Sequence, residues 1–359
     1  MKSFGLVFLC LLLAFPTIAR EYFGDSYTTE DLGKGFNSQT YQSMPSCLDG
    51  TLVKHTQGKG ELNFLNQLDQ RQVRSRTFGE VHGGVNLFIV AGSVSTSVYH
   101  TNARDDLTVS SSLHLYFDEG HHTFENRQVL NDVDTSQCGD SFVYQVDYGR
   151  DIFLTSQLHF QSVEDYKKFV TKVKIRLLFW TKTKTTTKEF KEYAQNAVLT
   201  VKVNSNGAIP ASLQALLESR PTSCKGDEVD ECMDTLNQLS TYLFEPTGLA
   251  QDMDAMPPVI RSMHTKQYQE SGHYSINQVE LPEQETLMNI VEAVEEEYGA
   301  RVRQEQRVKA FYQVAETEEE QSVYLAQWQA ATAHREAFEP IRERCFRTPF
   351  ENECLPPFE

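Results

Sequence analysis

One stretch decides the fold of this chain, and it reads Cys138-Gly139-Asp140-Ser141-Phe142-Val143-Tyr144-Gln145-Val146-Asp147-Tyr148-Gly149-Arg150. It places a Gly-x-x-Phe motif, six residues and a second glycine at the entry to a run in which apolar and polar residues alternate. Alternation with a period of two is typical of a β-strand that buries one face. The stretch is therefore predicted to open a long amphipathic strand.

The β pattern extends on both sides of this stretch, from about residue 56 to residue 205. Leu113 to Phe117 and Ile152 to Phe160 alternate between apolar and polar residues. The clearest alternation is in Lys172 to Phe179 and in Leu199 to Val203, which we expect to form an antiparallel pair across the polar stretch between them. These two strands could belong to a membrane-inserting hairpin or to an ordinary half-buried sheet, and the pattern itself leaves both interpretations open.

The residues before and after this region lack the β pattern. Residues 20–55 are rich in Ser, Thr, Gly and Tyr and predict loop or a loosely packed arm. After residue 210, Ala211 to Glu218 and Asp230 to Tyr242 are expected to be helices, the second with Asp230 as its N-cap. From Leu287 to Trp328 apolar residues recur at helical spacing, and Glu295 to Glu297 fit a solvated helix face, so a helical hairpin or small bundle is predicted.

The motif at 138–150 resembles the signature of the membrane-attack-complex/perforin superfamily, which reads Gly-Thr-His-Tyr/Phe, six residues, Gly-Gly. Val146 to Leu154 looks like a strand of the cholesterol-dependent cytolysins, which share that fold, and Ala197 to Pro210 is similar to a cytolysin strand that ends in a turn. The resemblance covers Val81 to Tyr268. Arg150 stands where the perforin motif has its second glycine, and the tryptophan-rich tip of the cytolysins is absent.

The resemblance implies an α+β fold, with a central bent antiparallel sheet flanked by helical clusters, followed here by a helical C-terminal region. It implies that the clusters, near residues 72–113 and 175–197, refold into β-hairpins and insert into a membrane. The implied sheet-bend residues are Gly139, Phe142, Tyr148, Gly149 and Arg150. The implied inserting strands include Val173, Ile175, Leu177, Phe179, Leu199, Val201 and Val203.

The expected function is that of a secreted, pore-forming-toxin-like protein that self-associates on a target membrane. Its expected partners are a lipid or glycan of that membrane and, once membrane-bound, further copies of the chain. The alternative is a non-lytic secreted adhesion or interaction protein on the same scaffold, which the lysines between residues 182 and 191 favour. The two differ in whether the assembled protein makes a membrane leak.

The first residues fit an export signal. Lys2 is followed by the apolar run Gly5 to Phe15 and by the small residues Thr17-Ile18-Ala19, so a mature start near Arg20 is expected. The apolar run is too short to span a bilayer. A secreted or extracytoplasmic location is therefore predicted.

Six cysteines remain after such a signal, and an even number in an exported chain favours disulfides. Proximity in the sequence suggests Cys224 with Cys232 and Cys345 with Cys354, which leaves Cys47 with Cys138. Fifteen pairings of six cysteines are possible, so the other connectivities stay open.

Composition argues against several classes of protein. The net charge of −17, from 50 acidic and 33 basic residues, opposes nucleic-acid binding and plain docking on anionic lipid. No nucleophile elbow, P-loop or H-E-x-x-H occurs, so no enzymatic activity, cofactor or metal is expected. The expected organisation is a signal (1–19), an N-terminal arm (20–55), a domain resembling the perforins and cytolysins (56–270) and a helical C-terminal region (271–359).

Overall fold

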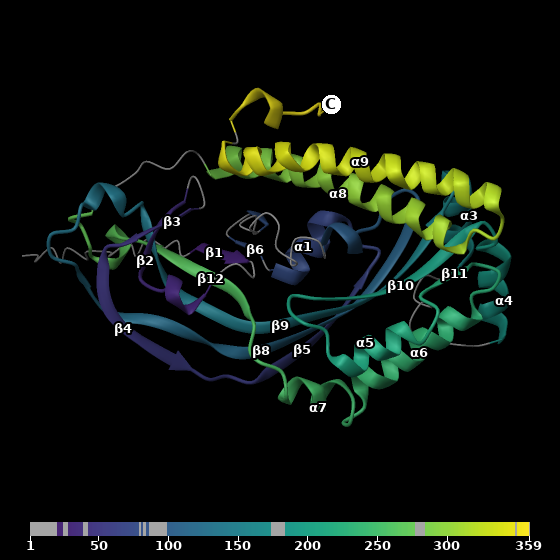
Figure 1. Ribbon diagram of the computed structural model, residues 1–359, viewed down its shortest axis with the longest axis horizontal. Helices are drawn as coiled ribbons and strands as arrows, with labels where there is room; N and C mark the ends of the chain where they lie inside the picture. Colours follow the sequence, from purple (N-terminus) through teal and green to yellow (C-terminus); the bar gives the residue numbers. More distant parts are fainter. Residues whose placement is uncertain are drawn as a thin grey trace, which may run out of the picture.

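The structure, a computed structural model, describes residues 20–23, 28–38, 42–78, 80–81, 84–85, 99–173, 184–276, 284–348 and 350–358. Over these residues the chain has a mixed α+β fold, with one large antiparallel sheet and a helical C-terminal region, as expected. Figure 1 shows the sheet curving beneath a long helical hairpin. Within the same residues, no helix combines the length and the apolar composition that crossing a bilayer requires.

Two long strands, β8 (Thr108–Val129) and β9 (Ser141–Phe160), pair with each other and run through both halves of the sheet. In one half, which we call the connector half, the strand order is β5-β8-β9-β10-β11. In the other, the turn half, it is β4-β8-β9-β12-β1. The remaining strands of this sheet are β1 (Arg20–Phe23), β2 (Lys34–Asn37), β3 (Gln42–Ser46), β4 (Leu48–His55), β5 (Lys59–Asn66), β10 (Ala197–Ser205), β11 (Ser223–Lys225) and β12 (Ile260–Gln267). A separate two-stranded ribbon joins β6 (Glu80–Val81) and β7 (Gly84–Val85).

The two halves meet at Tyr148 and Gly149 of β9, where both neighbouring strands are irregular. The pairing of β8 shifts register between Asp118 and Gly120, and that of β12 shifts between Ile260 and Ser262. Such bulges bend a strand and increase its twist. A Cβ on Gly149 would lie 2.8 Å from a ring carbon of Tyr116, so a larger residue would disturb the pairing with β8.

Helices cover both faces of the connector half. The face that carries Leu113, Leu154 and Leu199 packs against helices α3 to α6 in one apolar core. The opposite face of β10 carries Val198, which contacts Phe311 of α8. The helices are α1 (Gln70–Phe78), α3 (Val163–Lys172), α4 (Lys184–Tyr193), α5 (Ala211–Glu218), α6 (Asp230–Phe244), α7 (Leu249–Asp254), α8 (Gln284–Val314) and α9 (Glu318–Arg347).

Three local expectations were wrong. In the described part of residues 20–55, β1, β2, β3 and β4 stand where loop or a loosely packed arm was expected, and they join the sheet through backbone pairing that needs no apolar period. Lys172 ends helix α3 and does not begin a strand, and Leu199 to Val203 pair with β9 instead. Helix α6 has Val229 as its N-cap, and the carboxylate of Asp230 instead lies 2.7 Å from the ammonium of Lys191. Ile175, Leu177 and Phe179 lie outside the described residues.

The helical C-terminal region and the cysteine pairing follow the expectations. α8 and α9 form a long antiparallel hairpin, which Figure 1 shows along one side of the molecule. The three disulfides join Cys47 to Cys138, Cys224 to Cys232 and Cys345 to Cys354.

Candidate membrane-inserting connectors

Two long connections leave the connector half of the sheet at the same end. The first connector, residues 67–107, links β5 to β8, and the second connector, residues 161–196, links β9 to β10. Each joins two neighbouring antiparallel strands. The strand ends lie together, because Thr108 pairs with His159 and Phe160 pairs with Ala197. Extending either connector would therefore lengthen its own pair of strands into one longer hairpin.

The first connector rests on a polar face of the sheet. Asn102 accepts a hydrogen bond from Ser110 Oγ through its backbone oxygen (2.7 Å) and one from Thr155 Oγ1 through its side chain (2.9 Å). Gln157 Nε2 donates to the carbonyl of Thr101 at 2.5 Å. All of these residues are buried, so the polar face that β-strand alternation would place in water is covered by the chain itself.

Helices α8 and α9 hold this connector through a buried charged cluster. The carboxylate of Glu295, on α8, is 1% exposed and accepts hydrogen bonds from Arg342 on α9 and from the hydroxyl of Tyr99 in the connector. Its Oε2 lies 3.0 Å from Nε2 of His100. Gln70 of α1 donates to the backbone oxygen of Glu295 at 2.7 Å. Through its carboxylate and its backbone oxygen, Glu295 thus connects α8, α9 and two parts of the first connector, and it does not lie on the solvated helix face that the sequence predicted.

Burial and the neighbouring charges set the protonation of this cluster. The pKa of His100 is about 4, because burial and the charges of Arg342 and Arg303 lower it more than Glu295 raises it. Burial would raise the pKa of Glu295, but Arg342 and His100 lower it overall. At neutral pH the cluster therefore holds an ionised Glu295 beside a charged Arg342 and a neutral His100.

Further contacts extend the attachment along α8. Arg303 donates to the side-chain oxygen of Gln70 at 2.8 Å, and Arg307 pairs with Asp105 at 3.1 Å. Gly299 faces the connector so closely that a Cβ would lie 2.0 Å from the same Gln70 oxygen. α8 is thus fitted to the first connector at several successive turns.

The first connector also has an apolar anchor. Val73, Phe78 and Tyr99 share a small buried cluster with Phe23 of β1 and Phe153 of β9. This cluster is much smaller than the main core of the connector half. Among the described residues, this connector is thus joined to α8 by polar and ionic contacts and to the sheet by polar contacts and this small apolar cluster.

The second connector is held by aromatic packing. Phe169 of α3 is 1% exposed, and its ring centroid lies 5.3 Å from that of Phe160 and 5.4 Å from that of Phe190 on α4. All three belong to the main apolar core. Ser162 caps α3 by accepting a hydrogen bond from the backbone N–H of Asp165. The ion pair of Lys191 with Asp230, in the described part of this connector, lies at the surface.

A cavity of about 490 Å³ lies between β10 and α8, lined by Thr200, Lys202, Gln306 and Lys309 among others. Burial, together with the nearby charge of Lys309, lowers the pKa of Lys202 to about 8. The polar residues that alternate with Leu199 and Val201 thus face α8 instead of bulk water.

The motif residues are separated in space. Gly139 precedes β9 in a turn with φ +76°, where a Cβ would lie 2.3 Å from the carbonyl oxygen of Phe36. Phe142 is fully buried in the turn half, whereas Gly149 lies at the junction of the two halves. Arg150, also buried, donates to the carbonyl oxygens of residues 208 and 257. A glycine could not form these bonds, which is a physical reason for the departure at this position.

The predicted membrane-inserting residues that the structure describes lie in two places. Val173 follows α3 with an extended backbone and is buried, next to the residues that the structure does not describe. Leu199, Val201 and Val203 lie in β10, which already belongs to the sheet. The Glu295 cluster was not anticipated, because no spacing in the sequence links residues near 100 to residues near 300.

Comparison with family models and with curated proteins gives no match. Solved structures similar to the chain include stonustoxin, with 10% identity over 92% of this chain and 49% of that one and a TM-score of 0.38. Pneumolysin matches 59% of this chain and 40% of its own at 10% identity, with a TM-score of 0.29. Astrotactin-2, described as a perforin-like membrane protein involved in neuronal development, matches 59% of this chain and 98% of its own at 8% identity, with a TM-score of 0.25. This chain thus spans about half of stonustoxin and two fifths of pneumolysin.

The topology of the chain itself matches what the motif at 138–150 implies. A bent antiparallel sheet carries two helix-containing connectors at one end, and both sit between neighbouring strands. The chain has a fold like that of the membrane-attack-complex/perforin and cholesterol-dependent cytolysin superfamily.

Proposed function

We propose that the protein is secreted, assembles on a target membrane and inserts its two connectors as β-hairpins. The observation that carries this proposal is the position of the connectors, which leave the sheet at one end and each join adjacent antiparallel strands. Each could therefore become a hairpin without any change in strand order. Three disulfides support secretion, because such bonds persist in oxidising compartments.

Both connectors have enough residues for the change. A strand that crosses a bilayer needs about 9–11 residues, so a hairpin needs about twice that number and a turn. The sequence suggested a short second segment at 175–197, but the connection between β9 and β10 comprises all of 161–196. The first connector is longer still.

The second connector has a suitable pattern for one membrane-crossing strand. Val173, Ile175, Leu177 and Phe179 alternate with cationic Lys172, Lys174 and Arg176. In a membrane barrel, apolar residues of a strand face lipid while the alternate residues face the water-filled interior. Lys172, the last residue of α3, would have to change from helix to strand for the whole pattern to be used.

Strand edges support assembly into a ring. In the described chain, β4 and β5 pair on one side only, and they expose Leu52, Leu62 and Phe64. The opposite edge of the connector half is covered by just the three residues of β11. The unpaired backbone groups of a strand edge can pair with a strand of another copy. Repeated contact between unlike edges closes into a ring when the rotation from one copy to the next permits it.

The target would be a lipid or glycan recognised by its own chemistry, since the net charge of −17 opposes binding to anionic lipid. The alternative is adhesion without a leak on the same scaffold. Astrotactin-2 is a perforin-like protein whose described role is in neuronal development. The lysines of the second connector would favour this alternative if they keep the hairpin out of lipid.

The test combines dye release from liposomes with two labelled variants, Thr171→Cys and Lys172→Cys, each carrying an environment-sensitive dye. Both positions are exposed at the end of α3 in solution. Thr171 shares the parity of Val173, so insertion as a strand places its label in lipid and the Lys172 label in water.

Dye release together with this difference between neighbours supports insertion. Assembly on vesicles with no release and with both labels remaining in water overturns it and favours adhesion. Lipids should range from phosphatidylcholine alone to mixtures with sterol and glycolipid.

A further inference from the structure

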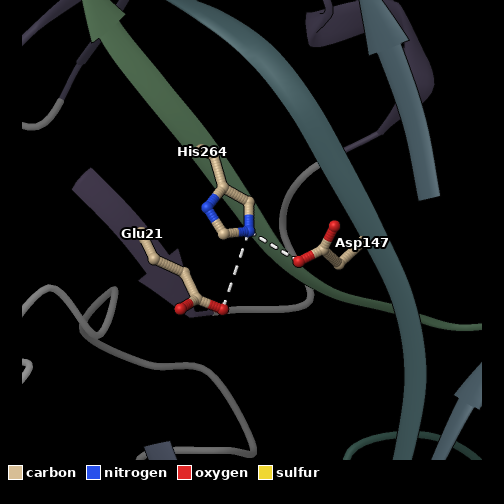
Figure 2. A group of neighbouring side chains, drawn as sticks. All are labelled: Glu21, Asp147 and His264. Atoms are coloured by element: carbon tan, nitrogen blue, oxygen red, sulfur yellow. Dashed lines mark hydrogen bonds and ion pairs between the residues drawn. The ribbon is translucent and has the colours of Figure 1, made fainter. Parts of the chain in front are cut away.

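A histidine and two carboxylates meet on one face of the turn half. Figure 2 shows His264 of β12 between Glu21 of β1 and Asp147 of β9. Nε2 of His264 lies 2.5 Å from Asp147 Oδ2 and 3.7 Å from Glu21 Oε1. One ligand atom from each residue lies within 4.8 Å of the other two. We propose that this group binds one divalent transition-metal ion of the zinc class.

The donor set fits such an ion. Zn²⁺ binds imidazole nitrogen and carboxylate oxygen at about 2.0–2.2 Å, which separates neighbouring tetrahedral ligands by about 3.4 Å. The distance from His264 to Glu21 is already near that value. The distance from His264 to Asp147 is that of a hydrogen bond, so the carboxylate would draw back by about 1 Å as the ion replaces the proton. A water molecule would complete the fourth position.

Neighbouring side chains already orient the two carboxylates. Ser262 Oγ donates to Glu21 Oε1 at 2.8 Å, and Gln145 Nε2 donates to the free oxygen of Asp147 at 2.7 Å. Outer partners of this kind fix ligand orientation in metal sites. The proposed ligand side chains are 16–25% exposed, so the group is sheltered yet open to an incoming ion.

The charge balance also favours a cation. Two carboxylates carry two negative charges, which one divalent ion would neutralise. Arg261, whose charge acts on His264, is bonded to Asp151 at 2.9 Å, so that charge is largely compensated. Imidazole as a ligand disfavours calcium and magnesium, which prefer oxygen donors.

Binding would link three strands at the edge of the sheet. Among the described strands β1 pairs with β12 alone, and Asp147 lies two residues before Gly149 at the junction of the two halves. An ion held by all three residues would fasten the N-terminal strand to β9 beside that junction.

The test is calorimetric titration of the tag-free, disulfide-intact chain with ZnCl₂ after chelator treatment, with Co²⁺ absorption as a second readout of ligand geometry. The expected result is one ion per chain and a higher thermal midpoint with zinc. His264→Gln and the nearly isosteric Asp147→Asn should each weaken binding by at least about tenfold.

His121→Ala is the control for capture of zinc by a neighbouring histidine, because His121 of β8 pairs with Asp147 of β9 and stacks on His55, yet is not one of the three proposed ligands. This variant should bind zinc like the unaltered chain. The proposal is overturned if no zinc binds, or if His264→Gln binds normally and His121→Ala does not.

Discussion

The two connectors occupy equivalent positions in the sheet but are held by different chemistry. The first connector lies on a polar sheet face and is fastened to α8 by the charged cluster around Glu295. The second connector is anchored by Phe169 and Phe190 in the main apolar core. The same topological event, release of a connector, therefore depends on electrostatics at one site and on apolar burial at the other.

This difference determines which surroundings would favour release of each connector. When the first leaves, it uncovers residues such as Ser112 and Thr155, which water can solvate. When the second leaves, it uncovers Leu158 and Phe160, which need lipid or another apolar surface. We expect the first connector to respond to pH and charge in solution, and the second to respond to a membrane.

The largest effect is expected from Arg342→Ala, which leaves the buried carboxylate of Glu295 without its cation. Removing one member of a buried ion pair costs about 3–5 kcal/mol of folding free energy. Chemical denaturation should show that loss, and amide exchange should show α1 opening more than α3. If α1 and α3 are exposed equally, the cluster does not hold the first connector in particular.

The control for this variant removes both charges. Glu295→Gln with Arg342→Met keeps an oxygen that can accept the Tyr99 hydroxyl and fills similar space. Replacing a buried ion pair by neutral groups of similar volume is often close to neutral. The double variant should therefore recover about 2 kcal/mol or more, whereas equal losses in both variants would point to packing instead of charge.

A somewhat smaller effect, about 3 kcal/mol, is expected from Phe169→Ala, because truncating a buried phenylalanine removes apolar contacts and leaves a cavity. Amide exchange should then show α3 opening while α1 stays protected. Phe350→Ala, at an exposed phenylalanine, is the matched control and should change stability little. Opening of α1 together with α3 would show that the two connectors are released as one unit and that their attachments are not independent.

Sequence could predict the long strands because their alternation reports directly on burial. Leu113 to Phe117 and Ile152 to Phe160 lie in β8 and β9 as expected, and α8 and α9 follow from their helical period. Val173 shows the limit, since the strand-like alternation around it begins at the end of helix α3. Period two marks what a segment can form, and at Lys172, the first residue of this alternation, the chain is still helical.

The charged cluster could not be predicted for a different reason. Glu295 sits in an acidic run that is typical of a solvated helix face, yet it is 1% exposed. Its partners Tyr99 and His100 are almost 200 residues away. Which member of an acidic run turns inward depends on what packs against the helix, and no local period records that.

The smallest predicted effect, about 2 kcal/mol between pH 7 and pH 5, comes from His100. Its pKa is about 4 in the folded protein, because burial disfavours the charged ring, and about 6.5 when unfolded. Between these values the unfolded chain binds more protons, so acid lowers stability from about pH 6.5 down to pH 4. Exchange of the α1 amides, corrected for intrinsic rates, should therefore rise as pH falls through this window, while α3 changes less.

His100→Asn should flatten this pH response of α1, because the charged groups facing the ring, Glu295, Arg342 and Arg303, do not titrate in that window. His159→Asn is the matched control: His159 is also buried with a lowered pKa, but it lies in β9 against Thr108 and Thr200. Its replacement should leave the α1 response in place. If His159→Asn flattens the response and His100→Asn does not, acid acts on the sheet beneath the first connector, and the polar attachment to α8 is not what makes the two connectors differ.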